Sequence, residues 1–323
     1  MKGLTMKLRV LVIGSLVAAC GSDAPTADDG PDAGLDTPAR GFQVVSPPIT
    51  IHPGEEVTYC YYFHTPNTET MSIKRWASSM TPGSHHMIMY TTTTDAMPPG
   101  TISTEGCGGF GGNNVPSWTY AAQTPVAEVA LPTDDGTGKP LGQEIAPGTP
   151  AYFQMHYLNA TDSDIQANVT LNAEAMEAGA VYTKTAAFVT YNSQISVPPH
   201  AMGDVESMTC NVPANTKFWS MSTHAHKQAV KTTVKDGTAA STAIAFTSTD
   251  WEHPGATTWM TSPFYSFASS KLTYECIYDN TGSNAGDTVV SGPSALTNEM
   301  CMATGYYFPA TKPLVCLNNL GPF

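Results

Sequence analysis

The sequence predicts an all-β fold, either one β-sandwich or a pair of β-sandwiches. Charged residues make up only 13% of the chain, and few windows carry an apolar stripe with helical spacing. Short runs rich in Val, Tyr, Thr and Phe are separated by Pro-Gly turns, a pattern typical of strands joined by tight connections. With 323 residues, the chain is long enough for two domains that each bury a core.

The strand candidates fall into two groups along the chain. The first group begins with an alternating stretch around a Pro-Gly turn, 44–63, and continues through 87–92, 151–158 and 167–171; a further run, 181–191, follows the junction described next. Residues 173–179 break the strand pattern, and we place a junction between two halves there. The second group consists of 217–226, 229–234, 271–278 and 306–308. No segment has the pattern of a long helix.

The N-terminus resembles the export signal of a bacterial lipoprotein. Three basic residues accompany an apolar stretch, 8–19, that is too short to span a bilayer. Small residues then precede Cys20, so we expect removal of the signal 1–19 and lipid attachment at Cys20. The alternative is ordinary secretion with Cys20 as a spare thiol. Residues 20–41 predict a disordered acidic tether, and we expect a protein anchored in the bacterial cell envelope, at its periplasmic face or the cell surface.

Charge and cysteine content limit the function classes. The formal net charge is -13, and loss of the three basic residues in 1–19 would give -16 (-13 minus 3). A net acidic surface repels phosphate backbones, so we do not expect nucleic-acid binding. Without Cys20 an even number of cysteines remains, which indicates up to three disulfides in an exported chain; which of the fifteen pairings forms is open. These residues are Cys60, Cys107, Cys210, Cys276, Cys301 and Cys316.

Two histidine pairs have spacings that suit a metal site in a β-protein. His224 and His226 are two residues apart, so on a strand both side chains lie on one face. An exposed polar stripe is the competing interpretation. His85 and His86 are adjacent, so they can reach one ion only at a strand end or a bulge, and the preceding Pro-Gly turn provides such a place. A His-His pair by itself is more often incidental.

His156 and Met300 extend the pattern. His156 lies in an apolar aromatic run, where a lone histidine is usually a hydrogen-bonded core residue, and a methionine such as Met300 is usually core filler. In order along the chain, however, the motifs His-His-Met, Gln-x-His-Tyr, His-x-His and Asn-Glu-Met-Cys resemble the type II copper, ascorbate-dependent monooxygenases. That family includes peptidylglycine α-hydroxylating monooxygenase and dopamine β-monooxygenase, and the resemblance covers nearly all of residues 42–323.

The resemblance implies two tandem antiparallel β-sandwich domains of jelly-roll type, 42–178 and 179–323. It assigns one copper, the electron-transfer centre, to His85, His86 and His156. It assigns a second copper, where dioxygen binds and the substrate C–H bond is attacked, to His224, His226 and Met300. Imidazoles suit copper in either oxidation state, a thioether favours Cu(I), and three protein ligands leave a position open. Gln154 is expected beside the first copper without binding it.

The resemblance also implies a reaction and a disulfide pattern. The reaction is hydroxylation of a C–H bond of a small organic substrate, with dioxygen as oxidant and ascorbate as reductant of two coppers per chain. The implied disulfides are Cys60–Cys107, Cys276–Cys301 and Cys210–Cys316. The bridge at Cys301 would restrain the backbone beside Met300.

The substrate departs from the peptidylglycine pattern. Those enzymes place an arginine two residues before the His-x-His motif to pair with the peptide carboxylate, and Ser222 here cannot form such a pair. The positions that hold the peptide end correspond to Met302 and Thr304. We therefore expect a neutral or aromatic substrate in place of a glycine-extended peptide.

One alternative function remains open. The same ligands would serve a copper-binding lipoprotein without turnover, acting in metal capture or tolerance. A zinc hydrolase is disfavoured because no carboxylate stands at ligand spacing to the histidines. We expect the remaining histidines to be surface or loop residues, and the aromatic residues between Trp251 and Phe267 to serve core packing. These histidines are His52, His64, His200 and His253.

Overall fold

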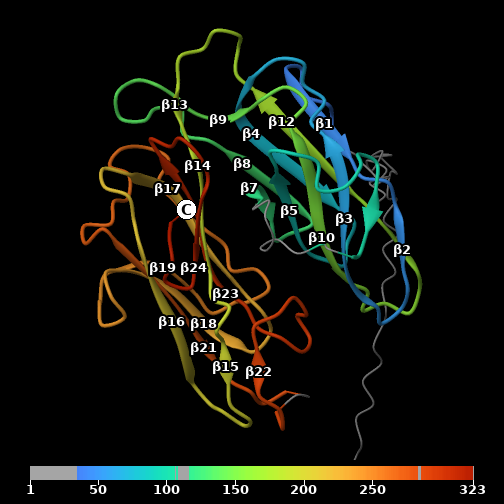
Figure 1. Ribbon diagram of the computed structural model, residues 1–323, viewed down its shortest axis with the longest axis vertical. Coiled ribbons are helices and arrows are strands. Elements are labelled where there is room, and N and C mark those ends of the chain that lie inside the picture. The colour runs from blue at the N-terminus through green and yellow to red at the C-terminus, as the bar shows by residue number, and fades with distance from the viewer. Residues whose placement is uncertain (1–34, 106, 108–115, 283–284, 323) are drawn as a thin grey trace, which may run out of the picture. The chain divides into compact units, whose positions relative to one another are not determined.

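The chain folds into strands and connecting loops, with no helix among the residues described (Figure 1). This computed structural model describes residues 35–105, 107, 116–282 and 285–322. The expected signal 1–19, Cys20 and most of the expected tether lie outside these ranges. Within them, no helix is long and apolar enough to cross a membrane. The all-β prediction is confirmed.

Two sheets from the first half of the chain enclose one apolar core, to which Phe42, Trp76, Tyr59 and Phe153 contribute. One sheet has the order β1-β12-β4-β9-β13, with β8 also paired to β4: β1 (Gly41–Val45), β12 (Val169–Ala175), β4 (Met71–Met80), β9 (Leu141–Ile145), β13 (Thr183–Lys184) and β8 (Val126–Ala130). The other has the order β6-β3-β10-β5-β7: β6 (Ile102–Ser103), β3 (Glu56–His64), β10 (Pro150–Leu158), β5 (Ser84–Thr91) and β7 (Ser117–Ala122). Strands β2 (Ile49–Ile51) and β11 (Ile165–Ala167) form a separate pair.

Two sheets from the second half enclose another core, to which Phe188, Phe218, Leu272 and Tyr274 contribute. The first has the order β20-β17-β23-β14-β24: β20 (Thr257–Thr258), β17 (Lys217–Ala225), β23 (Cys301–Phe308), β14 (Ala186–Tyr191) and β24 (Leu314–Leu317). The second has the order β16-β21-β18-β19: β16 (Asp204–Asn211), β21 (Lys271–Tyr278), β18 (Ala229–Asp236) and β19 (Ile244–Ser248). Strands β15 (Ser196–Val197) and β22 (Val289–Val290) pair separately.

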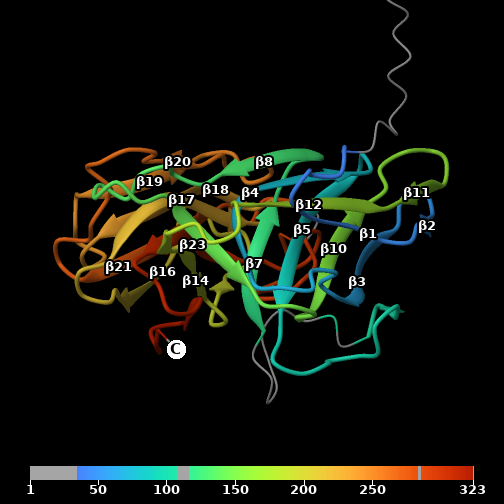
Figure 2. The same ribbon diagram turned by 90° about the horizontal axis from the view of Figure 1, so that it is seen from above.

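The two sheet pairs form the β-sandwiches that the sequence predicts (Figures 1 and 2). Their pairing is not purely antiparallel, however, because β9–β13 and β14–β24 are parallel. Strand β13 follows the expected domain boundary at residue 178 but adds to a sheet of the first half. Residues 34–323 form one compact unit, and the division into domains 42–178 and 179–323 stays a prediction.

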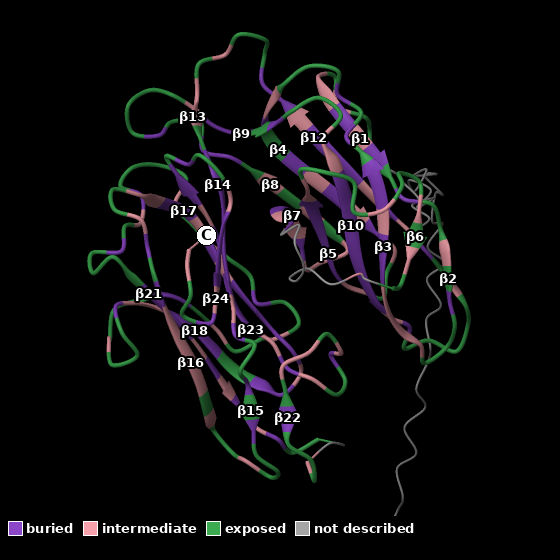
Figure 3. Cartoon of the chain, viewed as in Figure 1, coloured by how far each residue is buried: buried purple, intermediate pink, exposed green. Residues whose placement is uncertain are grey.

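Strand β10 shows how the sequence positions the later site. Nearly all of its residues are buried, which indicates that both of its faces are covered (Figure 3). Because side chains alternate along a strand, Phe153 and Met155 point into the first core, whereas Tyr152, Gln154 and His156 share the opposite face. That opposite face is turned toward the second half of the chain.

An apolar cluster joins the two halves. Cys60, Tyr90 and Trp118 of the first half pack in one buried cluster with Val189 and Met302 of the second. Apolar burial of this kind stabilises association by about 25 cal/mol per Å². The face of β10 that carries His156 therefore lies where the two sandwiches meet.

The folded part begins earlier than the sequence indicated. The Gln43 side-chain amide donates to the Leu35 carbonyl at 2.7 Å, and Asn172 donates to the Asp36 carbonyl at 2.7 Å. Arg40 donates to the Met176 carbonyl at 2.6 Å. Residues 35–41 are thus hydrogen-bonded to the first sandwich, whereas the sequence predicted a disordered tether as far as residue 41.

Candidate metal centre

The first histidine pair lies at a bulge at the start of β5. Gly83, in the turn before it, has a φ of +97°, which favours glycine. In the pairing of β5 with β10, His86 is opposite His156, but the next partners are Ser84 and Tyr157, so His85 has no partner. A bulge re-aims side chains locally, which is how two adjacent histidines approach one site. The strand end and bulge that the sequence required are both present.

The second pair lies at the end of β17. His224 is in the strand opposite Met302 of β23, and His226 follows the strand directly. Met300 precedes β23, whose first residue, Cys301, is opposite Ala225. The motifs His-x-His and Met-Cys, distant in sequence, are therefore neighbours through one antiparallel pairing.

The five histidines that the sequence predicted as metal ligands lie together in one cluster. His85 is its centre, with ring centroids 5.2 Å from His86, 5.2 Å from His156, 5.4 Å from His224 and 5.9 Å from His226. Two groups have nitrogen atoms within 4.8 Å of one another: His85, His86 and His156, and His85, His224 and His226. The sequence predicted two separate sets, but the structure brings them together, with His85 in both groups.

One nitrogen of each histidine is buried and has no hydrogen-bond partner: His85 Nε2, His86 Nδ1, His156 Nδ1, His224 Nε2 and His226 Nε2. Burying an unpaired polar atom is costly, so five such atoms facing one place indicate a missing partner. A divalent or monovalent transition-metal ion is such a partner, because neutral imidazole nitrogen is a preferred ligand of copper and zinc. The residues present therefore fit a metal centre.

Burial also keeps the imidazoles neutral. It lowers the pKa of His85 to about 3 and that of His226 to about 4. The pKa values of His86 and His224 fall well below the usual value for the same reason, and neighbouring histidines add to the shift. Metal binding requires the unprotonated ring, so these histidines are ready to bind at neutral pH without losing a proton.

Three of the rings are oriented through their second nitrogen. His156 Nε2 lies 2.9 Å from Glu56 Oε1, and His224 Nδ1 lies 2.6 Å from Gln123 Oε1. His226 Nδ1 lies 3.1 Å from the Asn298 carbonyl. Each of these acceptors requires an N–H on the ring, which leaves the lone pair on the other nitrogen, the one that faces the cluster.

Glu56 links the two halves at this site. Its carboxylate also accepts a hydrogen bond from Ser294 Oγ at 2.9 Å and from the Ala295 N–H at 2.8 Å. Although burial opposes ionisation, the hydrogen bonds from His156, Ser294 and Ala295 lower the pKa of Glu56 to about 2. An ionised carboxylate thus orients a histidine of the first half and holds the loop that leads to Met300.

Glu299 is hydrogen-bonded to the backbone that carries His226. It is fully buried, and its carboxyl oxygens accept the N–H of His226 at 3.0 Å and of Gln228 at 2.8 Å. Burial raises the pKa of Glu299 to about 7, against the effect of these hydrogen bonds. The backbone that carries His226 is therefore fixed to the residue next to Met300.

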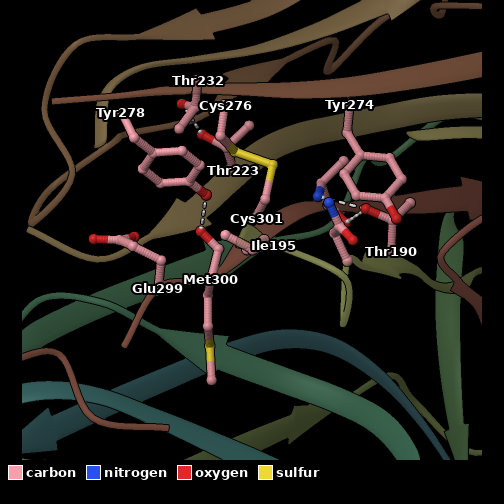
Figure 4. Close-up of a disulfide and its surroundings, with 12 residues drawn as sticks. Thr190, Ile195, Thr223, Thr232, Tyr274, Cys276, Tyr278, Glu299, Met300 and Cys301 are labelled. Carbon is pink, nitrogen blue, oxygen red and sulfur yellow. Dashed lines mark hydrogen bonds between the residues drawn. A yellow bond between two sulfur atoms is a disulfide. The ribbon is translucent and has the colours of Figure 1, made fainter. Parts of the chain in front are cut away.

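The backbone at Met300 is restrained by a disulfide at the next residue and by a hydrogen bond to the Met300 carbonyl. The neighbouring Cys301 is bonded to Cys276, and the Tyr278 hydroxyl donates to the Met300 carbonyl at 2.8 Å. Figure 4 shows the Met300 side chain extending away from this disulfide. It reaches the cavity that His86, His156 and His224 also line. The structure contains two further disulfides, Cys60–Cys107 and Cys210–Cys316.

A cavity of about 1010 Å³ opens beside the histidines and is lined from both halves. Aromatic and apolar side chains prominent in its wall are Tyr90, Trp118, Met302 and Tyr306. Ser222 and Thr304, which the sequence placed at the substrate wall, also line it. Among the described lining residues there is no lysine or arginine. The wall therefore offers no lysine or arginine to pair with a carboxylate, while it includes the carboxylates of Glu56 and Glu128.

The sequence missed several residues at this site. Glu56 and Gln123 belong to no motif, and only the fold brings them to the histidines. Trp251 packs against the second core, as expected, and its ring also lies 5.5 Å from that of His85. His253, expected on the surface, is exposed but lines the cavity. Gln154 lines the cavity, and its side-chain amide donates to the Cys107 carbonyl at 2.8 Å. Its expected place beside the first copper stays a prediction.

The other three histidines lie apart from the cluster. His52 and His64 are exposed and pair with Asp164 and Asp95, at 2.9 and 2.7 Å. His200 is exposed in a loop. Their interpretation as surface residues agrees with these positions.

The fold and the donor set define an all-β protein with a histidine cluster between two sandwiches that could hold metal ions. Residues 172–322 match the family model described as copper type II ascorbate-dependent monooxygenase, C-terminal domain. This match covers the part of the chain that contains His224, His226 and Met300, and it supports the resemblance found in the motifs.

Other comparisons add nothing on function. No curated protein matches the chain. A solved structure described as that of infectious bursal disease virus Gx strain is 13% identical, with 86% of this chain and 79% of that chain covered, at a TM-score of 0.19. A similarity this low supports no argument about fold or activity.

Proposed function

We propose that this protein is a copper-dependent monooxygenase that hydroxylates a C–H bond of a small organic substrate, using dioxygen and a reductant such as ascorbate. The observation that carries the proposal is the set of five unpaired buried histidine nitrogens beside a cavity that Met300 also lines. The family match over residues 172–322 supports copper as the metal.

In this proposal His86 and His156, with His85, hold one copper, and His224, His226 and Met300 hold the other. Bound copper supplies one-electron redox chemistry with dioxygen. The chain's own residues orient the ligand rings through Glu56, Gln123 and the Asn298 carbonyl. The net reaction takes two electrons from the reductant and two protons, and puts one oxygen atom on the substrate and the other into water.

The cavity supports a neutral, partly aromatic substrate. Trp118, Tyr90 and Tyr306 contribute aromatic surface to its wall. Ser222 cannot pair with a carboxylate, and its hydroxyl is engaged with the Gly255 carbonyl. Since no cationic side chain is among the described lining residues, a carboxylate would lose its hydration without compensation.

Export and lipid anchoring remain part of the proposal. Three disulfides support an oxidising compartment. Incorporation of labelled palmitate in a bacterial host, abolished by Cys20→Ala, would test the anchor.

The main experiment is oxygen uptake by purified, copper-loaded protein with ascorbate, screened against neutral aromatic compounds, amines and carboxylates. We expect uptake with neutral aromatic compounds, and product that carries one oxygen atom from isotopically labelled dioxygen. A His224→Ala, His226→Ala variant controls for copper in solution. Copper binding without uptake above this control, for every compound, would favour the alternative of a non-catalytic copper-binding lipoprotein.

A further inference from the structure

His85 occupies a position that the two-copper assignment does not explain. It completes a compact nitrogen group with His86 and His156, and an equally compact group with His224 and His226. Its ring lies about as far from that of His224, 5.4 Å, as from that of His86, 5.2 Å.

His85 cannot complete both groups at once. Its Nε2 is the nitrogen left buried and unpaired, and a neutral imidazole has only one nitrogen with a free lone pair. The backbone leaves it more freedom than its neighbour, because the pairing of β5 and β10 skips His85 at the bulge while His86 is fixed opposite His156.

The His224–His226 pair has a second candidate for its third ligand. Met300 lines the same cavity as His224, and a thioether is a soft donor that favours Cu(I). An imidazole from His85 serves either oxidation state. The two donors therefore differ most when the copper is oxidised.

We propose that His85, His224 and His226 form a three-nitrogen copper site. His85 then binds the copper of either the first or the second group, but not both at once, and at the second group it alternates with Met300. This inference rests on the proposed function, because it requires copper at His224 and His226. It assigns to His85 a role beyond the first copper.

A pair of variants separates the two roles. In His86→Ala, His156→Ala protein, the first group keeps only His85, while the second keeps all its donors. Addition of His85→Ala to this background should weaken Cu(II) binding at least about 100-fold, since even indirect ligand supports are worth about 10- to 100-fold. It should also remove one nitrogen coupling from the electron paramagnetic resonance spectrum. Cu(I) affinity should fall less, because Met300 remains.

Addition of His52→Ala to the same background is the matched control. His52 is exposed, pairs with Asp164 and belongs to neither group, so its removal should leave Cu(II) affinity within about threefold, well below the effect of a lost ligand. Glutamine in place of alanine at positions 86 and 156, with near-ultraviolet circular dichroism, guards against a folding defect.

The outcomes are distinct. Equal Cu(II) affinity with and without His85 would overturn the shared-ligand proposal, as would a folded background variant that binds no copper. Two coppers in the unmodified protein would leave the proposed function intact in both cases. Failure of the unmodified protein to bind any copper would instead defeat the proposed function itself.

Discussion

Glu56 Oε1 lies 2.9 Å from His156 Nε2, and through this contact one carboxylate of the first sandwich orients a predicted ligand while it holds a loop of the second. His156 Nδ1 is unpaired, so the proton is on Nε2 and Nε2–H donates to Glu56. The same carboxylate accepts the Ser294 hydroxyl, four residues before Asn298, whose carbonyl orients His226. The two histidine groups are therefore coupled through the protein as well as through His85.

Replacement of Glu56 by alanine should weaken copper binding by about 10- to 100-fold, the usual effect of removing the hydrogen-bond partner of a ligand histidine. The reason is that His156 loses the acceptor that fixes its tautomer and ring orientation. Chelator competition titrations measure the affinity. Glu55→Ala is the control, because the Glu55 carboxylate accepts the backbone N–H of His52, a residue that belongs to neither histidine group. Equal affinities in the two variants would contradict the prediction.

The sequence predicted the local geometry of the ligands well. Alternation along a strand put His224 and His226 within reach of one ion, and the rule for adjacent residues required the bulge found at His85. The family resemblance supplied Met300 as a partner, which spacing alone could not. The approach of each histidine pair could be predicted because it depends on neighbouring residues alone, whereas Met300 as a third ligand stays a prediction.

The relation between the two sandwiches was beyond the sequence. Whether His85 approaches His224 depends on packing across the cluster of Tyr90, Trp118 and Met302, which has no periodic pattern. Strand β4 was missed for a different reason. Its pairing with β12 skips Lys74 at a bulge, which breaks the alternation that would have identified the strand.

Gln123 provides a second test of coupling between the halves. Its side chain, from the loop after β7, accepts from His224 Nδ1 at 2.6 Å and donates to the Thr223 carbonyl at 3.3 Å. Gln123→Ala should remove both contacts and lower copper affinity at the second group by about 10-fold. Gln123→Glu should retain the acceptor and most of the affinity. If both variants bind copper as the unmodified protein does, Gln123 does not orient His224.

Acid should destabilise the metal-free protein below about pH 6.5, where histidines of the unfolded chain take up protons. Burial holds the pKa of His85 at about 3 and of His226 at about 4, with His86 and His224 also well below normal. Below about pH 6.5 the unfolded state therefore binds more protons than the folded state, so the free energy of unfolding decreases as the pH is lowered. Glu299 acts in the opposite direction, since its pKa is raised to about 7, but it is one group against four.

Urea unfolding of chelator-treated protein between pH 7.5 and 5 would measure this dependence. We expect the free energy of unfolding to decrease steadily over that range. The His86→Gln, His224→Gln variant, which lacks two of the four groups, should show a smaller slope. An unfolding free energy that is constant over the range would contradict the neutral state of the buried cluster.

Trp251 should report copper binding by fluorescence. Its ring centroid is 5.5 Å from that of His85, close enough for a bound Cu(II) ion to quench its emission strongly. Trp251→Phe should therefore lose most of the copper-dependent quenching. Trp76→Phe, a change in the core of the first sandwich, should retain it. Unchanged quenching in Trp251→Phe would mean that copper binds elsewhere.

The Cys276–Cys301 disulfide should matter both for stability and for Met300. It closes a loop with a sequence separation of 25, and a bridge of this size is worth about 3 kcal/mol. Cys276→Ala with Cys301→Ala should therefore lower the melting temperature. It should also weaken Cu(I) binding more than Cu(II) binding, because Met300 loses a backbone restraint and a thioether contributes most to Cu(I). Removal of Cys60–Cys107, which lies in the other half, should lower the melting temperature without that preference for Cu(I). Equal losses of Cu(I) and Cu(II) affinity in the Cys276, Cys301 variant would show that the bridge does not act through Met300.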